Sequence, residues 1–215
     1  MSTTTARTDN EDLPPIAVAT RLFDIFARSV NVFFPVVENS SLETILHIAY
    51  NSDDVVVEGC HDQNRQLFFT ILAIASLVAK RSDPNLPFLA REYFNQAIRH
   101  FDDASCDHAS KASQIFIFQR TLLISLYLLL SPSAGDIWRN LGFAIRLFFD
   151  LSHRSFVEGD EELHLFHMLT RTLYCLERYD ESQHAEPEER FRPFVELTSS
   201  SSKASYRPLL AAQHY

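Results

Sequence analysis

Apolar residues recur every three to four positions through most of the chain, which is the spacing of one face of an α-helix. The pattern is clear from Ile16 to Val30 and again from Leu67 to Val78. Pro35 is expected to end the first of these helices and Pro84 the second, because the residue before a proline disfavours helical geometry. No alternation typical of a strand stands out, so the pattern predicts an all-α protein.

Further helices begin at recognisable signals. Ser40 and Glu43 have the spacing of a capping box and predict a short helix to about Tyr50. The segment from Asn51 to Cys60 is expected to be an acidic loop. Pro87 suits the first turn of a fourth helix, where a missing N–H costs nothing.

The stretch from Ser110 to Leu130 predicts a fifth helix that is apolar nearly all round. Such a helix is typical of the centre of a bundle. Its apolar part, from Ile115, is about one turn shorter than the roughly 20 residues of a bilayer span, so we expect a buried helix of a soluble protein. A sixth helix starts near Trp138, and Asp160 is expected to cap a seventh.

This reading gives a single irregular bundle of about seven helices over residues 14–180. Residues 1–13 are rich in threonine and charge and are expected to form a disordered tail. Residues 181–215 include the run Ser199 to Ser202 and are expected to be a poorly ordered tail. No internal repeat is present.

The composition agrees with a helical core and argues against some classes of binding partner. The chain has 18 Phe, which bury large apolar areas, and only 4 Gly, too few for a hairpin-rich fold. The formal net charge is −9 and no basic run occurs. Binding to DNA or to an anionic membrane rests on positive charge, so neither is expected of these residues by themselves.

Cysteine spacing gives no metal or disulfide framework. Three cysteines are spread far apart without a CxxC pair: Cys60, Cys106 and Cys175. Reduced, buried thiols in an intracellular protein are the simplest interpretation. His100, Cys106 and His108 cluster in a polar loop, but zinc would need a fourth ligand there.

Catalytic patterns are missing as well. His164 and His167 have the helical spacing of metal ligands, with Glu161 preceding them, yet no second helix offers matching ligands. The pairs Asp53-Asp54 and Asp102-Asp103 are interpreted as solvated surface. Phosphate-binding loops and nucleophile elbows do not occur, so no catalytic residue, no bound metal and no cofactor are expected, and the protein is not predicted to be an enzyme.

One segment resembles a known family. Trp138 to Arg154 reads W-R-N-L-G-F-A-I-R-L-F-F-D-L-S-H-R. This is similar to the regulatory, or middle homology, domain of fungal zinc-cluster (Zn2Cys6-type) transcription factors. The helix before it, Gln119 to Leu130, the later Leu173 to Arg178 and the opening Pro14 to Pro35 match the family's other segments in order.

The chain also departs from the family pattern. It has only Ser152 where the family usually has Gly-Leu before its His-Arg pair, and Glu177 where Asp is customary. Thr170-Arg171 stands in place of a common Phe-Trp pair. The six-cysteine zinc cluster, which would supply the DNA-reading helix and hold zinc, does not occur in these residues.

The signature residues are expected to be structural. Trp138 would fill a pocket between helices, and Gly142 would let another helix approach, so that a large residue there costs about 1–3 kcal/mol. Arg146 is expected to be largely buried and paired with Asp150 or Glu177, because a buried guanidinium needs a counter-charge.

The remaining signature residues lie near helix ends or on the seventh helix. His153 and Arg154 fall where a helix ends, and cations there complement its carbonyl groups. Tyr174 and Arg178 belong to the later motif and are also expected to be structural.

The resemblance implies a nuclear domain that controls transcription through a small-molecule effector or a protein partner, with DNA contact only through a zinc cluster. A shift between two packed arrangements is the expected device. Homodimerisation is compatible with the apolar excess. A helical protein-interaction scaffold unrelated to transcription is the alternative. Whether the chain is a truncated product or a standalone domain stays open.

Overall fold

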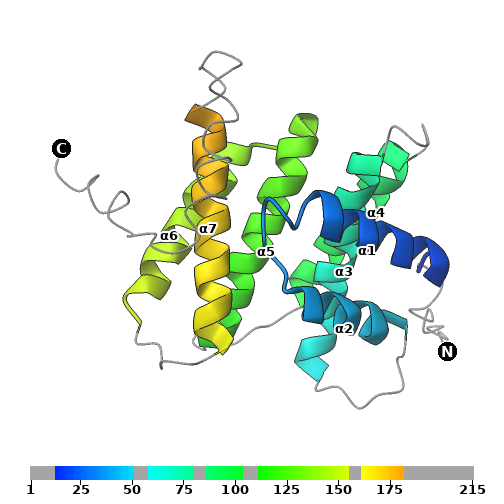
Figure 1. Cartoon of the computed structure of the whole chain (residues 1–215), viewed down its shortest axis with the longest axis horizontal. Helices are drawn as coiled ribbons and strands as arrows, with labels where there is room; N and C mark the ends of the chain where they lie inside the picture. The colour runs from blue at the N-terminus through cyan, green and yellow to red at the C-terminus, as the bar shows by residue number, and fades with distance from the viewer. Residues whose placement is uncertain (1–12, 51–57, 80–85, 104–110, 155–160, 182–215) are drawn as a thin grey trace, which may run out of the picture. The chain divides into compact units, whose positions relative to one another are not determined.

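The computed structural model describes residues 13–50, 58–79, 86–103, 111–154 and 161–181 (Figure 1). These residues form helices and connecting turns, with no strand among them, which confirms the predicted all-α fold. The helices in chain order are α1 (Ile16–Ser29), α2 (Asn39–Tyr50), α3 (Glu58–Val78), α4 (Leu86–Asp103), α5 (Lys111–Leu130), the short 3-10 helix η2 (Pro132–Ala134), α6 (Ile137–Ser152) and α7 (Glu161–Glu181).

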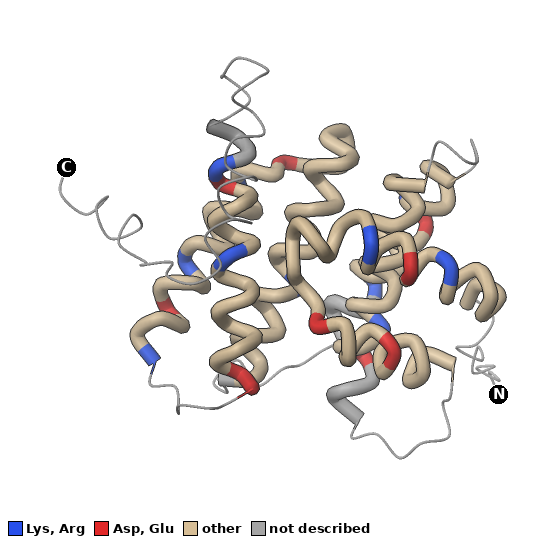
Figure 2. Tube along the Cα trace, viewed as in Figure 1, with Lys and Arg blue, Asp and Glu red and all other residues tan. Residues whose placement is uncertain are grey.

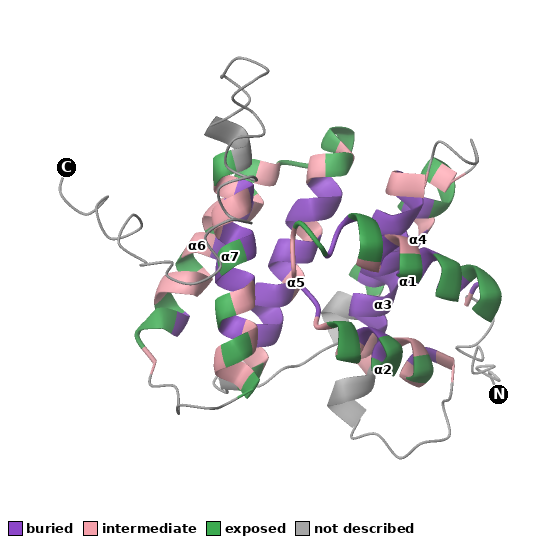
Figure 3. Ribbon diagram, in the orientation of Figure 1, coloured by how far each residue is buried: buried purple, intermediate pink, exposed green. Residues whose placement is uncertain are grey.

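Helix α3 lies at the centre of the packing. It packs against α1, α2, α4 and α5. Every side chain from Arg65 to Leu77 is buried, and Figure 3 shows the buried colour along this part of α3. The sequence pattern had assigned one inward face to this helix, but burial all round follows from its four neighbours.

Helix α5 is the other core helix, as its uniform apolarity predicted. The expectation that it falls a turn short of a membrane span is wrong, because residues Ala112–Leu130 are long and apolar enough to cross a bilayer. However, 67% of that window is buried inside the protein. Its apolar surface is therefore used in packing against α3 and α6.

Aromatic rings link the helices. Phe68 on α3 lies 5.5 Å from Phe23 on α1 and 5.2 Å from its neighbour Phe69, measured between ring centroids. Phe94 on α4 stacks on Tyr127 of α5 at 3.8 Å. These ring contacts explain why a chain rich in Phe builds its core from aromatic side chains.

A second group of rings joins the later helices. The Phe166 ring of α7 lies 6.3 Å from Phe118 of α5 and stacks nearly parallel on Phe148 of α6 at 5.9 Å. The helical spacing of Leu163, Phe166, Thr170, Leu173 and Leu176 predicts that they face inward; the last four are buried, whereas Leu163 is half-buried. Phe166 therefore brings α7 into contact with both α5 and α6.

Three element boundaries differ from the sequence prediction. Helix α1 ends at Ser29, well before Pro35, because the chain turns after Val30. Ser40 is the second residue of α2 and is not its cap. Helix α3 begins at Glu58, so Cys60 lies in a helix and not in a loop. Pro87 does lie in the first turn of α4.

Several predictions concern residues outside the described part of the chain. These are the proposed caps Ser110 and Asp160, the loop from 51 to 57 and most of both tails. Contacts along the chain divide it into two compact units, the first ending at Leu173 and the second beginning at Tyr174. The pocket and the α6 surface described below belong entirely to the first unit.

Candidate functional site

The loop between α1 and α2 is built around one buried amide side chain. Asn31 is 7% exposed, and its Nδ2 donates to the Val37 carbonyl at 2.7 Å and to Asn39 Oδ1 at 3.3 Å. Its Oδ1 accepts from the backbone N–H groups of Val36 at 3.0 Å and Val37 at 3.2 Å. One side chain therefore fixes the course of the loop into α2.

Two distant helices hold the same loop. Gln119 of α5 donates from Nε2 to the Val36 carbonyl at 2.8 Å. Thr172 of α7 donates from Oγ1 to the Pro35 carbonyl at 2.8 Å. Together with Asn31, these side chains satisfy three consecutive loop carbonyls that would otherwise be buried at a cost.

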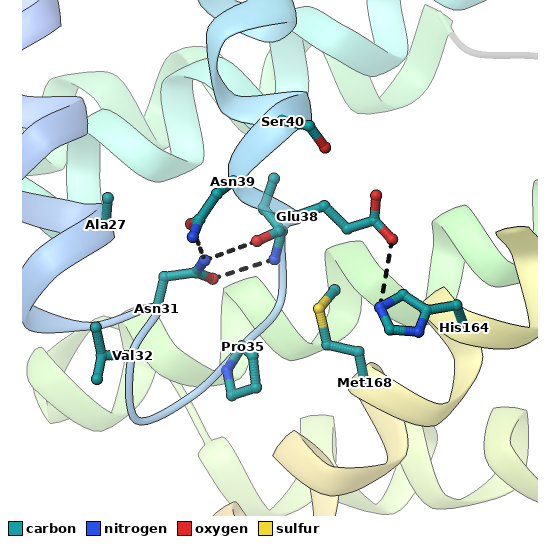
Figure 4. A pocket seen from close by; sticks show the side chains of 10 residues that line it. Ala27, Asn31, Val32, Pro35, Glu38, Asn39, Ser40, His164 and Met168 are labelled. Atoms are coloured by element: carbon teal, nitrogen blue, oxygen red, sulfur yellow. Dashed lines mark hydrogen bonds and ion pairs between the residues drawn. The ribbon is translucent and has the colours of Figure 1, made fainter.

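An open pocket of about 500 Å³ lies beside this loop. Figure 4 shows Asn31 reaching toward Asn39 on one side, and Glu38 facing His164 of α7 on the other. The lining combines apolar and polar side chains: Ala27, Asn31, Val32, Pro35, Val37, Glu38, Asn39, Ser40, His164 and Met168. A small amphipathic molecule would meet both kinds of surface there.

The charged groups at the pocket edge interact weakly. His164 Nε2 lies 3.9 Å from Glu38 Oε1, and the side chains are 76% and 35% exposed. An exposed ion pair of this kind contributes at most about 1 kcal/mol, and only while the imidazole is protonated. The pair lies at the edge of the pocket, and the pocket stays open to solvent.

The candidate metal ligands do not converge among the described side chains. His164 faces Glu38, while His167 is exposed and its ring lies 6.2 Å from that of Phe166. The described residues contain no group of three side chains able to hold a metal ion. Cys175 is a half-buried thiol. His100 lies in α4 and not in a loop as predicted, and the side chains of His100, Cys106 and His108 lie outside the described part of the structure.

The signature residues of α6 contradict their predicted core roles. Trp138 is 53% exposed, so it does not fill a pocket between helices. A Cβ added at Gly142 would meet nothing within 4 Å, so no helix approaches there. Arg146 is exposed and makes no hydrogen bond or ion pair with any described residue, Asp150 and Glu177 included.

The orientation of α6 explains these corrections. Leu141, Ala144 and Leu151 are its buried residues. Asn140 donates from Nδ2 to the Thr121 carbonyl and to Ser125 Oγ of α5, both at 2.8 Å. This arc turns toward α5, which leaves the line of positions 138, 142 and 146, each four residues apart, on the outer side.

The ends of α6 are capped by side chains. Asp136 accepts from the backbone N–H of Trp138 at 3.0 Å and of Arg139 at 3.4 Å. At the other end, the Nδ1 atom of His153 lies 2.7 Å from the Phe149 carbonyl oxygen. The predicted helix-end position of His153 and Arg154 is confirmed.

Tyr174 and Arg178 form a local pair on α7, one turn apart. Arg178 Nε donates to the Tyr174 hydroxyl at 3.2 Å, and its guanidinium carbon lies 5.6 Å from the ring centroid. The contact is of the kind that stabilises one helical turn by a few tenths of a kcal/mol.

Sequence reasoning missed the residues that hold the loop. Asn31 interrupts an apolar run, and Gln119 interrupts an almost wholly apolar helix. A polar residue at such a position must be satisfied when it is buried, which is a usable signal. The identity of the acceptors, more than 80 positions away for Gln119, has no such signal in the sequence.

Comparisons with known proteins found no relative of this chain. The chain matches no family model, no curated protein and no solved structure. Its function is therefore inferred from its own residues and from the fungal pattern they resemble.

Proposed function

We propose that the chain is a regulatory domain that acts on transcription in the nucleus through a protein partner or a small-molecule effector. It would resemble the middle homology domain of fungal zinc-cluster factors. The observation that carries the proposal is the line of Trp138, Gly142 and Arg146 on α6, where Trp138 and Arg146 are exposed and a Cβ added at Gly142 would meet nothing within 4 Å. These three residues belong to the segment that resembles the fungal pattern, and packing among the described residues does not account for any of them.

A large exposed aromatic residue favours partner binding over a purely internal role. Trp and Arg are the side chains most enriched at energetic centres of protein interfaces. Here both lie on one side of one helix, about two turns apart. A partner that covers this stripe would bury the indole and neutralise the guanidinium in one step.

The pocket beside the α1–α2 loop supports an effector route. A ligand there would touch the loop at Asn31 and Pro35 and also touch α7 at His164. It would therefore act on the contact between that loop and α7, where Thr172 holds the Pro35 carbonyl. Differential binding to two arrangements of this contact is the physical requirement for regulation.

In this proposal, DNA contact and zinc binding belong to a six-cysteine cluster outside these residues. The net charge of −9 leaves the chain a poor DNA ligand. Regulation would then be exercised on a factor that supplies its own DNA-binding helix, within the same polypeptide or in a partner.

A tethered reporter assay tests the proposal. The chain is placed between a heterologous DNA-binding domain and an acidic activation segment, and a flexible linker of equal length replaces it in the control. We expect the chain to change reporter output relative to the linker. Equal output from folded, nuclear fusions of both kinds would contradict a regulatory role.

A helical scaffold unrelated to transcription is the second candidate, and the same exposed α6 stripe favours it. The scaffold predicts partner binding through α6 with no effect on the reporter. Comparing binding with reporter output therefore separates the two functions.

A further inference from the structure

We infer that the outward surface of α6 binds an acidic peptide segment that carries large apolar side chains. This "α6 surface" consists of Trp138, Arg139, Gly142, Phe143 and Arg146. The inference deepens the proposed function by naming the chemistry of the partner, and it relies on that function only for the biological role of binding.

The five positions form one continuous arc of the helix. At about 100° per residue they span roughly 140° of the circumference. Trp138 is 53% exposed and Phe143 is 46% exposed, while both arginines are exposed. Two aromatic and two basic side chains thus share one side of α6, opposite the arc that packs on α5, and the exposed Asp150 lies at the far end of the same side.

Charge favours an acidic occupant. Figure 2 shows charges of both signs along α6, and within the helix they are two arginines and one aspartate, Asp150. Neither Arg139 nor Arg146 makes a side-chain ion pair with the described residues. An unpaired basic surface on a chain of net charge −9 attracts acidic partners over short range, where local charge outweighs the total.

The same charges disfavour other occupants. A second copy of the chain would bring its own arginines against these arginines, and both copies would carry the same net charge. A nucleic acid would meet only two basic groups on this surface, far fewer than a phosphate backbone needs for tight binding.

Gly142 leaves an open space in the middle of the α6 surface. Nothing lies within 4 Å of a Cβ built there, and Trp138 and Arg146 stand one turn before and one turn after it. An aliphatic or aromatic side chain of the partner can enter this space with the indole on one side. Its acidic neighbours would then reach the two guanidinium groups.

Trp138 is the only tryptophan in the chain and reports binding directly. The probe is a 20-residue peptide without Trp, in which Asp and Glu are interspersed with Leu and Phe. We expect saturable binding by the full chain, a blue shift of the Trp138 emission as the indole is buried, and weaker binding in high salt. A peptide with Lys in place of every acid is expected not to bind.

Variants locate the binding site. Arg146→Glu and Gly142→Leu are each expected to weaken binding about tenfold or more, since one reverses a charge and the other fills the space. Arg21→Glu, at an exposed arginine of α1, is the matched control and is expected to leave affinity unchanged. Circular dichroism verifies that every variant is folded.

Three results would overturn the inference: no binding of the acidic peptide, equal binding of the Lys peptide, or unchanged affinity in both α6 variants. If the acidic peptide does not bind but the chain still changes reporter output, the inferred role of the α6 surface is wrong and the regulatory role stands. If the peptide binds but the chain does not change reporter output, the regulatory role is wrong and the inferred binding surface stands.

Discussion

Asn31 uses every hydrogen-bonding group of its side chain, with two bonds donated and two accepted. Such full use at a buried position means that the residue specifies the loop geometry as well as stabilising it. The pocket wall formed by Pro35 and Glu38 depends on that geometry.

Replacing Asn31 with alanine is expected to lower the free energy of unfolding by about 2–4 kcal/mol, because several buried backbone groups lose their partners. Asn39→Ala is the matched control, since Asn39 is exposed and accepts one long bond of 3.3 Å from Asn31. It should cost less than about 1 kcal/mol. Urea unfolding followed by circular dichroism measures both, and similar losses would refute the role of Asn31.

Gly142 gives a prediction opposite to the sequence-based one. Because the space around it is open, Gly142→Ala is expected to raise the free energy of unfolding by up to about 1 kcal/mol through helix propensity alone. Gly135→Ala serves as the control: that residue lies outside a helix interior, and its new Cβ would come 3.1 Å from Leu128 Cδ2. Thermal unfolding decides, and a lower midpoint for Gly142→Ala would show that α6 is covered.

At the scale of elements, the α1–α2 loop connects helices that are distant in the sequence. Gln119 of α5 and Thr172 of α7 bond to adjacent carbonyls, those of Val36 and Pro35. Movement of either helix would therefore act on the same loop. This arrangement gives the proposed regulation a specific location within the bundle.

Coupling between the two contacts can be measured with a double-mutant cycle. Gln119→Met and Thr172→Val each remove one bond and are expected to cost about 1–3 kcal/mol. Because they hold the same loop, the double variant should deviate from additivity by about 0.5 kcal/mol or more. Pairing Thr172→Val with Thr70→Val, which affects a bond inside α3, is the additive control. Additivity in both cycles would mean that the loop does not couple α5 to α7.

At the scale of the whole molecule, the partial burial of several tyrosine hydroxyl groups makes the free energy of unfolding decrease at alkaline pH. Burial, followed by the interaction with Tyr93, raises the pKa of Tyr50 to about 12. Its hydroxyl also donates to the Pro14 carbonyl. Burial likewise raises the pKa of Tyr93 and of Tyr127.

The sign of this dependence follows from proton linkage. The native state keeps the Tyr50 proton above pH 10, where the unfolded chain releases it, so this stabilisation is present below about pH 10 and is lost as pH rises toward about 12. Tyr50→Phe is expected to make the loss of stability over that range less steep than in the unaltered protein. Free energies of unfolding at several alkaline pH values measure the slope, and equal slopes would contradict the assignment.

The sequence predicted the helical architecture well because apolar periodicity reports burial directly. It failed on the orientation of α6, where apolar residues occupy most of the circumference and several arcs could face the core. The choice is made by tertiary contacts, notably the Asn140 amide with Thr121 and Ser125 of α5. Trp138 and Arg146 were therefore expected inside although they lie outside, and the candidate site became visible only with the fold.

The most direct measurement of the central claim is reporter output from the tethered chain with and without an intact α6 surface. The variant combines Trp138→Ala with Arg146→Glu, two exposed positions whose replacement leaves the core unchanged. Phe88→Ala with Arg21→Glu, at exposed positions on α4 and α1, is the control. We predict that the α6 variant loses the effect of the chain on the reporter while the control keeps it. An undiminished effect in the folded α6 variant would contradict the account.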